Sequence, residues 1–320
     1  MEQQSIIWTE KYRPKTFADV RGHKEITQKL QAFIAQKNLP HLLLSGPAGV
    51  GKSTLALVIA RAFFGENYRE NFLELNSSDE RGIDVVRIKV KDFARTKALG
   101  DVPFKIIFLD ECDALTKEAQ QALRRTMENY TGTCRFILAA NYSSKIIDPI
   151  QSRCAVFRFK PLAKEDVILA INHIAKEEKI TIDETAKEAL AHIADGDLRR
   201  VANLLQSASA VNPKITKEVL YSLASVAEPT EIKEALGIAI KGNFVAAKDK
   251  LLEIMLRYGL SGIDMAKQIQ QEIWNLEIDN RKKVTLIDKC GEAEFRMVEG
   301  SDEFIQLEAL LAQFVLAGSQ

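Results

Sequence analysis

The chain has 320 residues, which is enough for two or three domains of ordinary size. Hydrophobic residues make up 46% and charged residues 28% of the chain, which excludes the disordered, collagen-like and disulfide-rich classes. Lys+Arg and Asp+Glu both number 44, so the formal net charge of zero excludes a uniformly basic nucleic-acid binder. A local basic surface, balanced by acidic residues elsewhere, remains compatible with this total.

No segment has the roughly 18 consecutive apolar residues of a membrane span, and Met1 begins a polar stretch without the core of a secretory signal. The cysteines, Cys112, Cys134, Cys154 and Cys290, are widely spaced and form no CxxC pair. We therefore expect a cytoplasmic protein whose thiols are reduced and mostly buried.

The first half of the chain alternates short apolar runs with helical stretches, a pattern typical of a parallel sheet with crossover helices. Two of the runs are continuous enough to be central strands covered on both faces, namely Phe104–Leu109 and Arg135–Ala140. The five predicted strands span residues 41–45, 72–75, 104–109, 135–140 and 155–159.

Past Pro161 helical periodicity dominates and no further strand is predicted. Several short helices are expected between Lys164 and Val226, one of them over Asp183–Ala194 with Asp183 as its N-cap. Glu228-Pro229-Thr230 is interpreted as a joint. Beyond it, longer amphipathic helices are predicted over residues 231–241, 244–258, 263–276, 281–298 and 303–316, with no cluster of catalytic residue types.

The most specific motif is Gly46-Pro47-Ala48-Gly49-Val50-Gly51-Lys52-Ser53-Thr54, which follows a predicted strand and opens a predicted helix over Ser53–Phe64. Its glycines let backbone N–H groups surround a β-phosphate at the positive end of the helix. Lys52 is placed to reach the β- and γ-phosphates, and the Ser53 hydroxyl to ligate Mg²⁺. The motif therefore predicts an ATP site.

Carboxylates follow the predicted strand Phe104–Leu109, as the second half of such a site requires. Asp110 is expected to hold Mg²⁺ through water, and Glu111 to act as the general base for the attacking water. Carboxylates after a strand also cap helices, and Asp113 fits that simpler role. Asn141, after the next strand, is a turn residue when taken alone. Within this set it is expected to orient the water or touch the γ-phosphate, so the chain is predicted to be an ATPase.

Together with the phosphate loop, an ordered set of motifs along essentially the whole chain resembles the small subunits of archaeal replication factor C, the sliding-clamp loaders of the AAA+ superfamily. These motifs are Trp8-Thr9-Glu10-Lys11-Tyr12-Arg13-Pro14 with Phe17, Asp19-Val20 and Gly22; Asn76-Ser77-Ser78-Asp79-Glu80-Arg81-Gly82-Ile83-Asp84-Val85-Val86-Arg87; Ala122-Leu123-Arg124-Arg125-Thr126-Met127-Glu128; Ser152-Arg153-Cys154; and Gly196-Asp197-Leu198-Arg199.

The resemblance implies an α/β nucleotide-binding domain over residues 1–160, an all-helical lid over 161–227 and an all-helical collar over 228–320 that holds the oligomer together. It implies that the segment with Tyr12, Arg13 and Val20 covers the adenine, although an aromatic leader of this kind also fits simple packing. It further implies that Asn141 is the sensor 1 residue and Arg199 the sensor 2 residue. Arg153 would then be an arginine finger that acts on ATP held by the adjacent subunit.

Clamp loaders of this family enclose primer–template DNA, and a predicted basic helix over Asp84–Leu99 is a candidate surface for it. The DNA-contact candidates are Arg81, Arg87, Lys89 and Arg124. An ordinary solvated basic face is the alternative for the helix, and a relay of nucleotide state is the alternative for Arg124. Contacts of this type would be made to phosphates and would weaken with salt.

The partners implied by the resemblance are a large subunit, further copies of the small subunit in a hetero-pentamer, the PCNA sliding clamp and primer–template DNA. ATP binding would open the clamp, and hydrolysis would release the closed clamp on DNA. Three departures from the usual family pattern remove no catalytic group. Cys112 replaces Ala, Ala48-Gly49-Val50 replaces Pro-Gly-Thr, and Asp195-Gly196-Asp197 has an Asp where Gly is usual. A non-hydrolysing structural subunit and another AAA+ replication or recombination ATPase are the alternatives.

Overall fold

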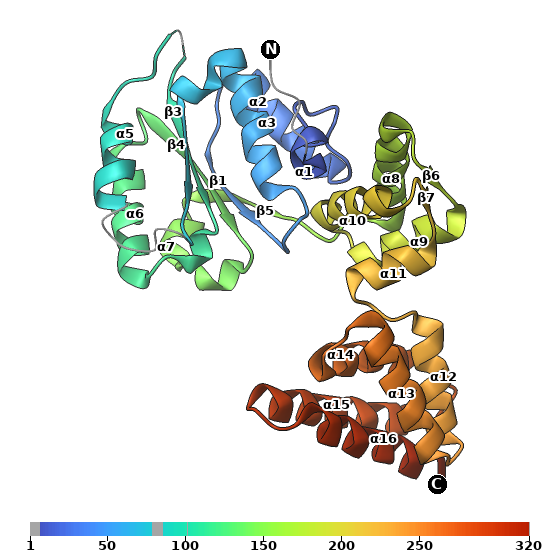
Figure 1. Cartoon of the computed structure of the whole chain (residues 1–320). Coiled ribbons are helices and arrows are strands. Elements are labelled where there is room, and N and C mark those ends of the chain that lie inside the picture. Colours follow the sequence, from blue (N-terminus) through green and yellow to red (C-terminus); the bar gives the residue numbers. More distant parts are fainter. Residues whose placement is uncertain (1–6, 79–85, 101, 320) are drawn as a thin grey trace. The chain divides into compact units, whose positions relative to one another are not determined.

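The computed structural model describes residues 7–78, 86–100 and 102–319. The chain divides into two compact units, Met1–Lys179 with Ala194–Gln206, and Ile180–Ile193 with Ser207–Gln320 (Figure 1). Within the described ranges, no helix combines the length and the apolar character that crossing a membrane requires.

A five-stranded parallel sheet forms the centre of the first unit, with the strand order β2-β3-β4-β1-β5. All five predicted strands are confirmed, and β3 and β4 lie inside the sheet with nearly every residue buried, as the continuous apolar runs predicted. The strands are β1 (His41–Ser45), β2 (Phe72–Asn76), β3 (Lys105–Asp110), β4 (Cys134–Ala140) and β5 (Cys154–Arg158).

Helices cover both faces of this sheet because successive strand residues point to opposite sides. Leu42 and Leu44 pack into a core with α2 and α3, whereas Leu43 packs into a second core with α6 (Figure 1). The helices of this unit are α1 (Trp8–Lys11), α2 (Lys24–Ala35), α3 (Lys52–Phe64), α5 (Lys91–Arg95), α6 (Lys117–Asn129), α7 (Asp148–Gln151), α8 (Lys164–Glu178) and the first part of α10 (Leu198–Val211). Its short turns of helix are η1 (Gly65–Glu70), η2 (Val86–Val90), η3 (Cys112–Ala114) and η4 (Ser143–Lys145).

The helix predicted over Asp84–Leu99 is wrong at its carboxyl end, because α5 ends at Arg95. Thr96 has an extended backbone, and its hydroxyl accepts a 2.6 Å hydrogen bond from Lys105 Nζ. The Asn71 side chain binds both the N–H and the carbonyl of Leu99, at 2.8 and 2.9 Å. These contacts hold the segment as a loop against β3 and β2, which local helical periodicity does not reveal.

The second unit is built mainly of the helices that the sequence predicted, with boundaries that differ by a few residues. Two of its helices begin with ordinary N-terminal caps. Asp183 Oδ1 accepts the Ala186 N–H at the start of α9, and Ser261 and Asp264 form a capping box at the start of α14. Its helices are α9 (Glu184–Ala194), α11 (Lys217–Ala224), α12 (Pro229–Ile240), α13 (Phe244–Tyr258), α14 (Gly262–Glu272), η5 (Ile273–Asn275), α15 (Asn280–Val298) and α16 (Glu303–Ser319).

One pair of strands in this unit was not predicted. β6 (Thr181–Ile182) and β7 (Lys214–Ile215) pair in parallel, and each has only two residues. Runs this short have no periodicity to detect, so they correct the prediction of an all-helical segment only locally.

The cysteines are free, and all except the half-buried Cys154 are buried, as predicted. Burial raises the pKa of the Cys134, Cys154 and Cys290 thiols to about 12, and it raises the pKa of Cys112 as well. Such thiols stay protonated near neutral pH, which makes them poor nucleophiles.

His41 makes stability depend on pH. The residue is 8% exposed, and its Nδ1 accepts the Phe136 N–H at 3.1 Å. Burial lowers the pKa of His41 from 6.5 to about 4, so between these values the unfolded chain binds a proton that the folded chain does not. As pH falls from 6.5 to 4, we expect this residue to remove about 3 kcal/mol from the free energy of unfolding.

Urea denaturation of the wild type and of His41→Gln across this pH range tests the prediction. Carboxylates titrate in both proteins, so the difference between the two profiles isolates the imidazole. The wild type should lose stability more steeply than the variant on acidification, and parallel profiles would contradict the assignment.

Candidate nucleotide site

The predicted nucleotide-binding residues meet at one edge of the sheet. In a parallel sheet the carboxyl ends of the strands share an edge, and here β1, β3 and β4 are neighbours. A cleft of about 600 Å³ opens there. Among its lining residues are Tyr12, Arg13, Val20, Ala48, Gly49, Val50, Gly51, Lys52, Ser53, Thr54, Asp110, Glu111, Asn141 and Arg199.

The loop between β1 and α3 has the conformation that its glycines permit. Gly46, Gly49 and Gly51 have φ angles of 153°, 72° and 97°, which L side chains rarely adopt. A Cβ on Gly46 would lie 2.4 Å from the Phe159 carbonyl oxygen, so this position also needs glycine for space. The loop ends at Lys52, where α3 begins and presents its first N–H groups to the cleft.

Lys52 holds the loop closed. Its Nζ donates to the carbonyl oxygens of Gly46 and Pro47, both at 2.6 Å, and to Asn141 Oδ1 at 3.0 Å. Burial lowers the pKa of the ammonium, while Asp110 and Asp113 act in the opposite direction. This buried cation thus links the phosphate loop to the end of β4, where a polyphosphate would offer it stronger acceptors.

The oxygen groups expected to hold Mg²⁺ are in contact. Ser53 Oγ donates to Asp110 Oδ2 at 2.6 Å, so a hydroxyl and a carboxylate converge at the start of α3. Mg²⁺ prefers hard oxygen ligands and is usually held by one or two carboxylates together with phosphate oxygens. The residues present therefore fit this ion.

Glu111 has an unusual backbone for a residue of its type. Its φ of 50° lies in the left-handed region, and its N–H donates to Asp110 Oδ1 at 2.9 Å. Left-handed backbone at a non-glycine residue is uncommon, and such strain concentrates at functional positions. The side chain is exposed and lines the cleft, where water has access to it.

Asp113 does not cap the following helix, contrary to the simpler interpretation of its position. Thr116 caps α6 by accepting the Ala119 N–H at 3.2 Å. The Asp113 carboxylate instead accepts the N–H groups of Asn141 and Tyr142, each at 3.2 Å. It fixes the backbone that carries Asn141, a role for which the sequence contained no signal.

The amino end of α10 lies directly against the phosphate loop. Asp197 Oδ1 accepts the N–H groups of Arg199 and Arg200, at 2.8 and 3.1 Å, and the Leu198 N–H donates to the Gly49 carbonyl at 3.3 Å. Asp195 and Gly196 precede it with φ of 46° and 80°. Two successive left-handed residues explain why glycine suits this turn and why aspartate is tolerated. Arg199 is thereby carried to the rim of the cleft.

Gly49 is the residue at which this contact can be tested. An added Cβ would lie 1.9 Å from Asp197 Oδ1, whereas one on Gly51 would meet nothing within 4 Å. Both positions have positive φ, so both alanine variants share backbone strain and only Gly49→Ala adds a clash. We expect Gly49→Ala to reduce the free energy of unfolding by about 1–3 kcal/mol more than Gly51→Ala, measured by urea denaturation without nucleotide. Equal losses would contradict the contact.

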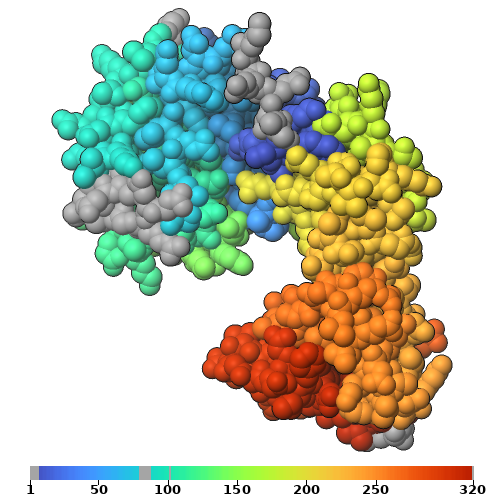
Figure 2. All heavy atoms as spheres, viewed as in Figure 1, coloured from blue at the N-terminus to red at the C-terminus, as the bar shows by residue number. Residues whose placement is uncertain are grey.

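The segment with Tyr12 and Arg13 lies on the surface of this unit beside α3, drawn in dark blue in Figure 2. Tyr12 Oη donates to Glu178 at 2.5 Å, and Arg13 Nε donates to Thr54 Oγ1 at 3.4 Å. Burial, followed by the hydrogen bond to Glu178, raises the pKa of Tyr12 to about 12. The Trp8 N–H donates to Gln206 Oε1 at 2.9 Å. The segment is therefore tied to α3, α8 and α10, the elements around the cleft.

Arg153 lies at the opposite edge of the sheet from the phosphate loop. β1 and β5 pair in register, with His41 beside Cys154 and Ser45 beside Arg158. Arg153 therefore precedes β5 at the amino-terminal edge, and a five-residue strand separates the two edges by about 16 Å. The exposed guanidinium is consequently too far to serve the ATP site of its own chain.

The DNA-contact candidates are only partly described. Arg81 and the side chain of Arg87 lie outside the described residues. Lys89 is exposed on η2, and Arg124 is half-buried on α6 with Nη1 3.6 Å from Glu128 Oε1. Lys89 and Arg124 are not among the residues that line the nucleotide cleft, and the DNA contacts of all four candidates stay predictions.

The cleft combines four features: a P-loop that leads into α3, acidic residues after β3, a polar residue after β4 and an arginine on a helix. Together they define a nucleotide-binding ATPase of the AAA+ class. Residues 42–162 match the model of the ATPase family associated with various cellular activities (AAA). Residues 227–313 match the model of the replication factor C C-terminal domain.

Relatives extend the match over nearly the whole chain. The replication factor C small subunit of Methanococcus maripaludis strain C5 is 54% identical over 306 residues, covering 96% of this chain and 97% of that protein. The replication factor C small subunit of Sulfurisphaera tokodaii is 52% identical over 320 residues, covering 99% and 98%. The chain belongs to the replication factor C small-subunit family.

The comparison with solved structures supports the fold. The Thermotoga maritima RuvB Holliday junction branch migration motor superposes with a TM-score of 0.56 at 18% identity, covering 72% of this chain and 79% of that one. At this identity the likeness shows a shared fold.

Proposed function

We propose that this chain is an ATP-driven subunit of a sliding-clamp loader. With a large subunit and further copies of itself, it opens the PCNA ring and loads it onto primer–template DNA, and hydrolysis releases the closed clamp. The observation that carries the proposal is the convergence of Lys52, Asp110, Glu111, Asn141 and Arg199 on one cleft, in a chain that matches small subunits from end to end.

The residues of the cleft suggest how ATP is hydrolysed. The loop N–H groups and Lys52 bind the phosphates, and Ser53 and Asp110 would hold Mg²⁺, which supplies charge neutralisation when bound. The Glu111 carboxylate takes a proton from the attacking water as the water oxygen bonds to the γ-phosphorus and the bond to ADP breaks. Asn141 orients this water, and Arg199, on α10, contacts the γ-phosphate.

Arg153 is proposed to act on ATP held by the adjacent subunit. Its exposure, and its position across the sheet from its own phosphate loop, favour action in trans. A guanidinium supplied by a neighbour stabilises charge on the transferring phosphoryl group and makes hydrolysis depend on assembly.

The domain assignment follows from the same function. We propose a nucleotide-binding domain over 1–160, a lid over 161–227 and a collar over 228–320. The match of residues 227–313 to the replication factor C C-terminal domain supports the collar.

We also propose contacts to DNA phosphates by four basic residues, Arg81, Arg87, Lys89 and Arg124. The affinity for DNA should then depend on duplex shape rather than base sequence, and it should fall as the salt concentration rises. The cytoplasmic location expected from the sequence stays a prediction.

ATP turnover by the chain tests the proposal, first alone and then with the large subunit, the clamp and primed DNA added stepwise. We expect low turnover alone and a rise with each addition. Nucleotide binding without turnover in the full assembly would indicate a structural or regulatory subunit. Brisk turnover that ignores clamp and DNA would indicate another AAA+ machine.

A further inference from the structure

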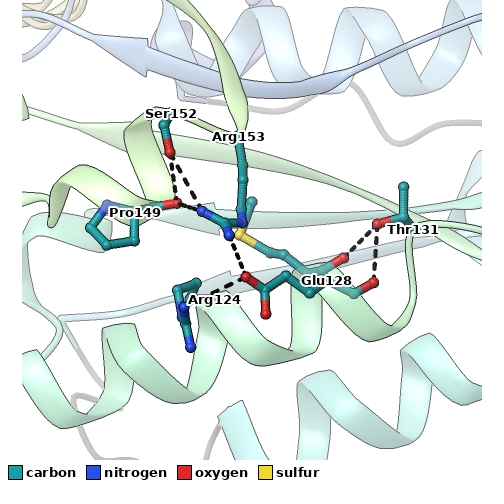
Figure 3. Close-up of polar contacts among 7 residues, drawn as sticks. Arg124, Glu128, Thr131, Pro149, Ser152 and Arg153 are labelled. Carbon is teal, nitrogen blue, oxygen red and sulfur yellow. Dashed lines mark hydrogen bonds and ion pairs between the residues drawn. The ribbon is translucent and has the colours of Figure 1, made fainter.

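The Arg153 guanidinium contacts three groups of its own chain (Figure 3). Its Nη2 lies 2.5 Å from Glu128 Oε1, and its Nη1 donates to the Pro149 carbonyl oxygen at 2.6 Å. Nη1 also lies 3.4 Å from Ser152 Oγ. Arginine has five N–H donors, so these contacts leave Nε–H and one Nη2–H for a phosphate oxygen.

The backbone of Glu128, the residue that contacts Arg153, is fixed by the packed end of α6. It lies in the last turn of α6, next to the fully buried Met127. Thr131 Oγ1 donates to the Met127 carbonyl at 2.7 Å and closes the end of the helix (Figure 3). The Glu128 carboxylate therefore projects from a packed helix end.

Glu128 is shared with a second cation. Arg124, one turn earlier on α6, brings Nη1 to within 3.6 Å of the same Oε1 atom. The Nε of Arg124 is buried without a hydrogen-bond partner among the described residues. Arg124 thus contacts the carboxylate from α6 itself, while Arg153 approaches it from the turn between α7 and β5.

Stabilisation of the fold is a weak explanation for this cluster. The side chains of Arg153, Glu128 and Arg124 are 36%, 37% and 30% exposed, and ion pairs at this exposure contribute little to stability. Orientation is a stronger explanation. An arginine side chain has many rotamers, and a finger is effective only when its guanidinium is already placed where phosphoryl charge develops.

The position of α6 strengthens this explanation. The helix begins shortly after the Asp110–Glu111 pair and has 13 residues, so it extends about 20 Å toward the edge where Arg153 lies. A single helix thus runs from the region that follows the Asp110–Glu111 pair to the residue that contacts Arg153.

We propose that Glu128 is a positioning residue, which orients Arg153 for the ATP site of the neighbouring subunit. The proposal rests on the finger role assigned to Arg153 above. It predicts that Glu128 affects the catalytic step only through Arg153, and that it does not affect ATP binding by its own chain.

The test measures kcat and KM for ATP in the complex with the large subunit, clamp and primed DNA. Glu128→Gln keeps the size of the side chain and removes its charge, and Glu118→Gln makes the same change in the exposed first turn of α6. We expect Glu128→Gln to lower kcat about 10-fold with KM unchanged, and Glu118→Gln to leave both unchanged. Thermal denaturation of each variant confirms that the chain is folded.

A double variant separates positioning from an independent effect. If Glu128 acts through Arg153, then Glu128→Gln with Arg153→Ala hydrolyses ATP no more slowly than Arg153→Ala alone. A further 10-fold loss in the double variant, or an unchanged kcat in Glu128→Gln, overturns the inference and leaves the finger role intact. An unchanged kcat in Arg153→Ala itself overturns the finger role, and the inference with it.

Discussion

Replacing Glu111 with glutamine is expected to lower kcat for ATP hydrolysis about 10²–10⁴-fold, the range that general-base catalysis contributes. Glutamine keeps the size of the side chain and loses the basic oxygen that accepts the proton of the attacking water. Lys52 and the Ser53–Asp110 pair remain, so ATP should bind as tightly as before. Single-turnover hydrolysis and equilibrium binding of a fluorescent ATP analogue, in the assembled complex, separate these two quantities.

Asp113→Asn is an informative companion to this variant. The two carboxylate oxygens of Asp113 each accept one N–H group, from Asn141 and from Tyr142, and the single amide oxygen of asparagine would keep one of these two hydrogen bonds. We therefore expect kcat to fall far less than in Glu111→Gln. A Glu111→Gln protein that hydrolyses ATP at the wild-type rate would show that another group takes the proton.

Replacing Arg153 with alanine is expected to lower kcat about 10³–10⁵-fold, because this change removes the positive charge that we propose faces the γ-phosphate of the neighbour. Because a whole strand separates Arg153 from the phosphate loop of its own chain, we expect this effect at the ATP site of the adjacent subunit. Complementation makes the distinction. Lys52→Ala removes a contact to phosphate within its own site and leaves its finger intact, whereas Arg153→Ala does the reverse.

Complexes assembled from a mixture of the two variants should recover part of the wild-type ATPase rate, since some Arg153→Ala sites then face an intact finger. Complexes of either variant alone should stay inactive, and they serve as the controls. If mixing restores nothing while both variants assemble, the finger does not act between copies of this chain.

The residues that line the nucleotide cleft were largely predictable, because most of them lie in short contiguous motifs. The phosphate loop must contain glycines at fixed positions, and the residues after β3 and β4 share an edge by the rules of a parallel sheet. Periodicity located the five strands and the longer helices for the same reason, since each signal is local.

Contacts between distant segments were not predictable. The sequence contains no mark that joins Asp113 to the backbone of Asn141, or Glu178 to Tyr12, because each pair is brought together by the sheet or by helix packing. The predicted end of α5 was wrong for the same reason. The side chain of Asn71, which lies between η1 and β2, fixes the backbone at Leu99.

The sequence by itself determined the class of this protein and the order of its elements, and it predicted which residues line the nucleotide cleft, since these depend on residue type and spacing. Tertiary structure alone decided which charges meet. Glu128 Oε1, at the end of α6, and Arg153 Nη2, just before β5, lie 2.5 Å apart because the fold brings together two segments that β4, η4 and α7 separate in the sequence. Packing of the chain, rather than local pattern, therefore placed the Glu128 carboxylate against the Arg153 guanidinium.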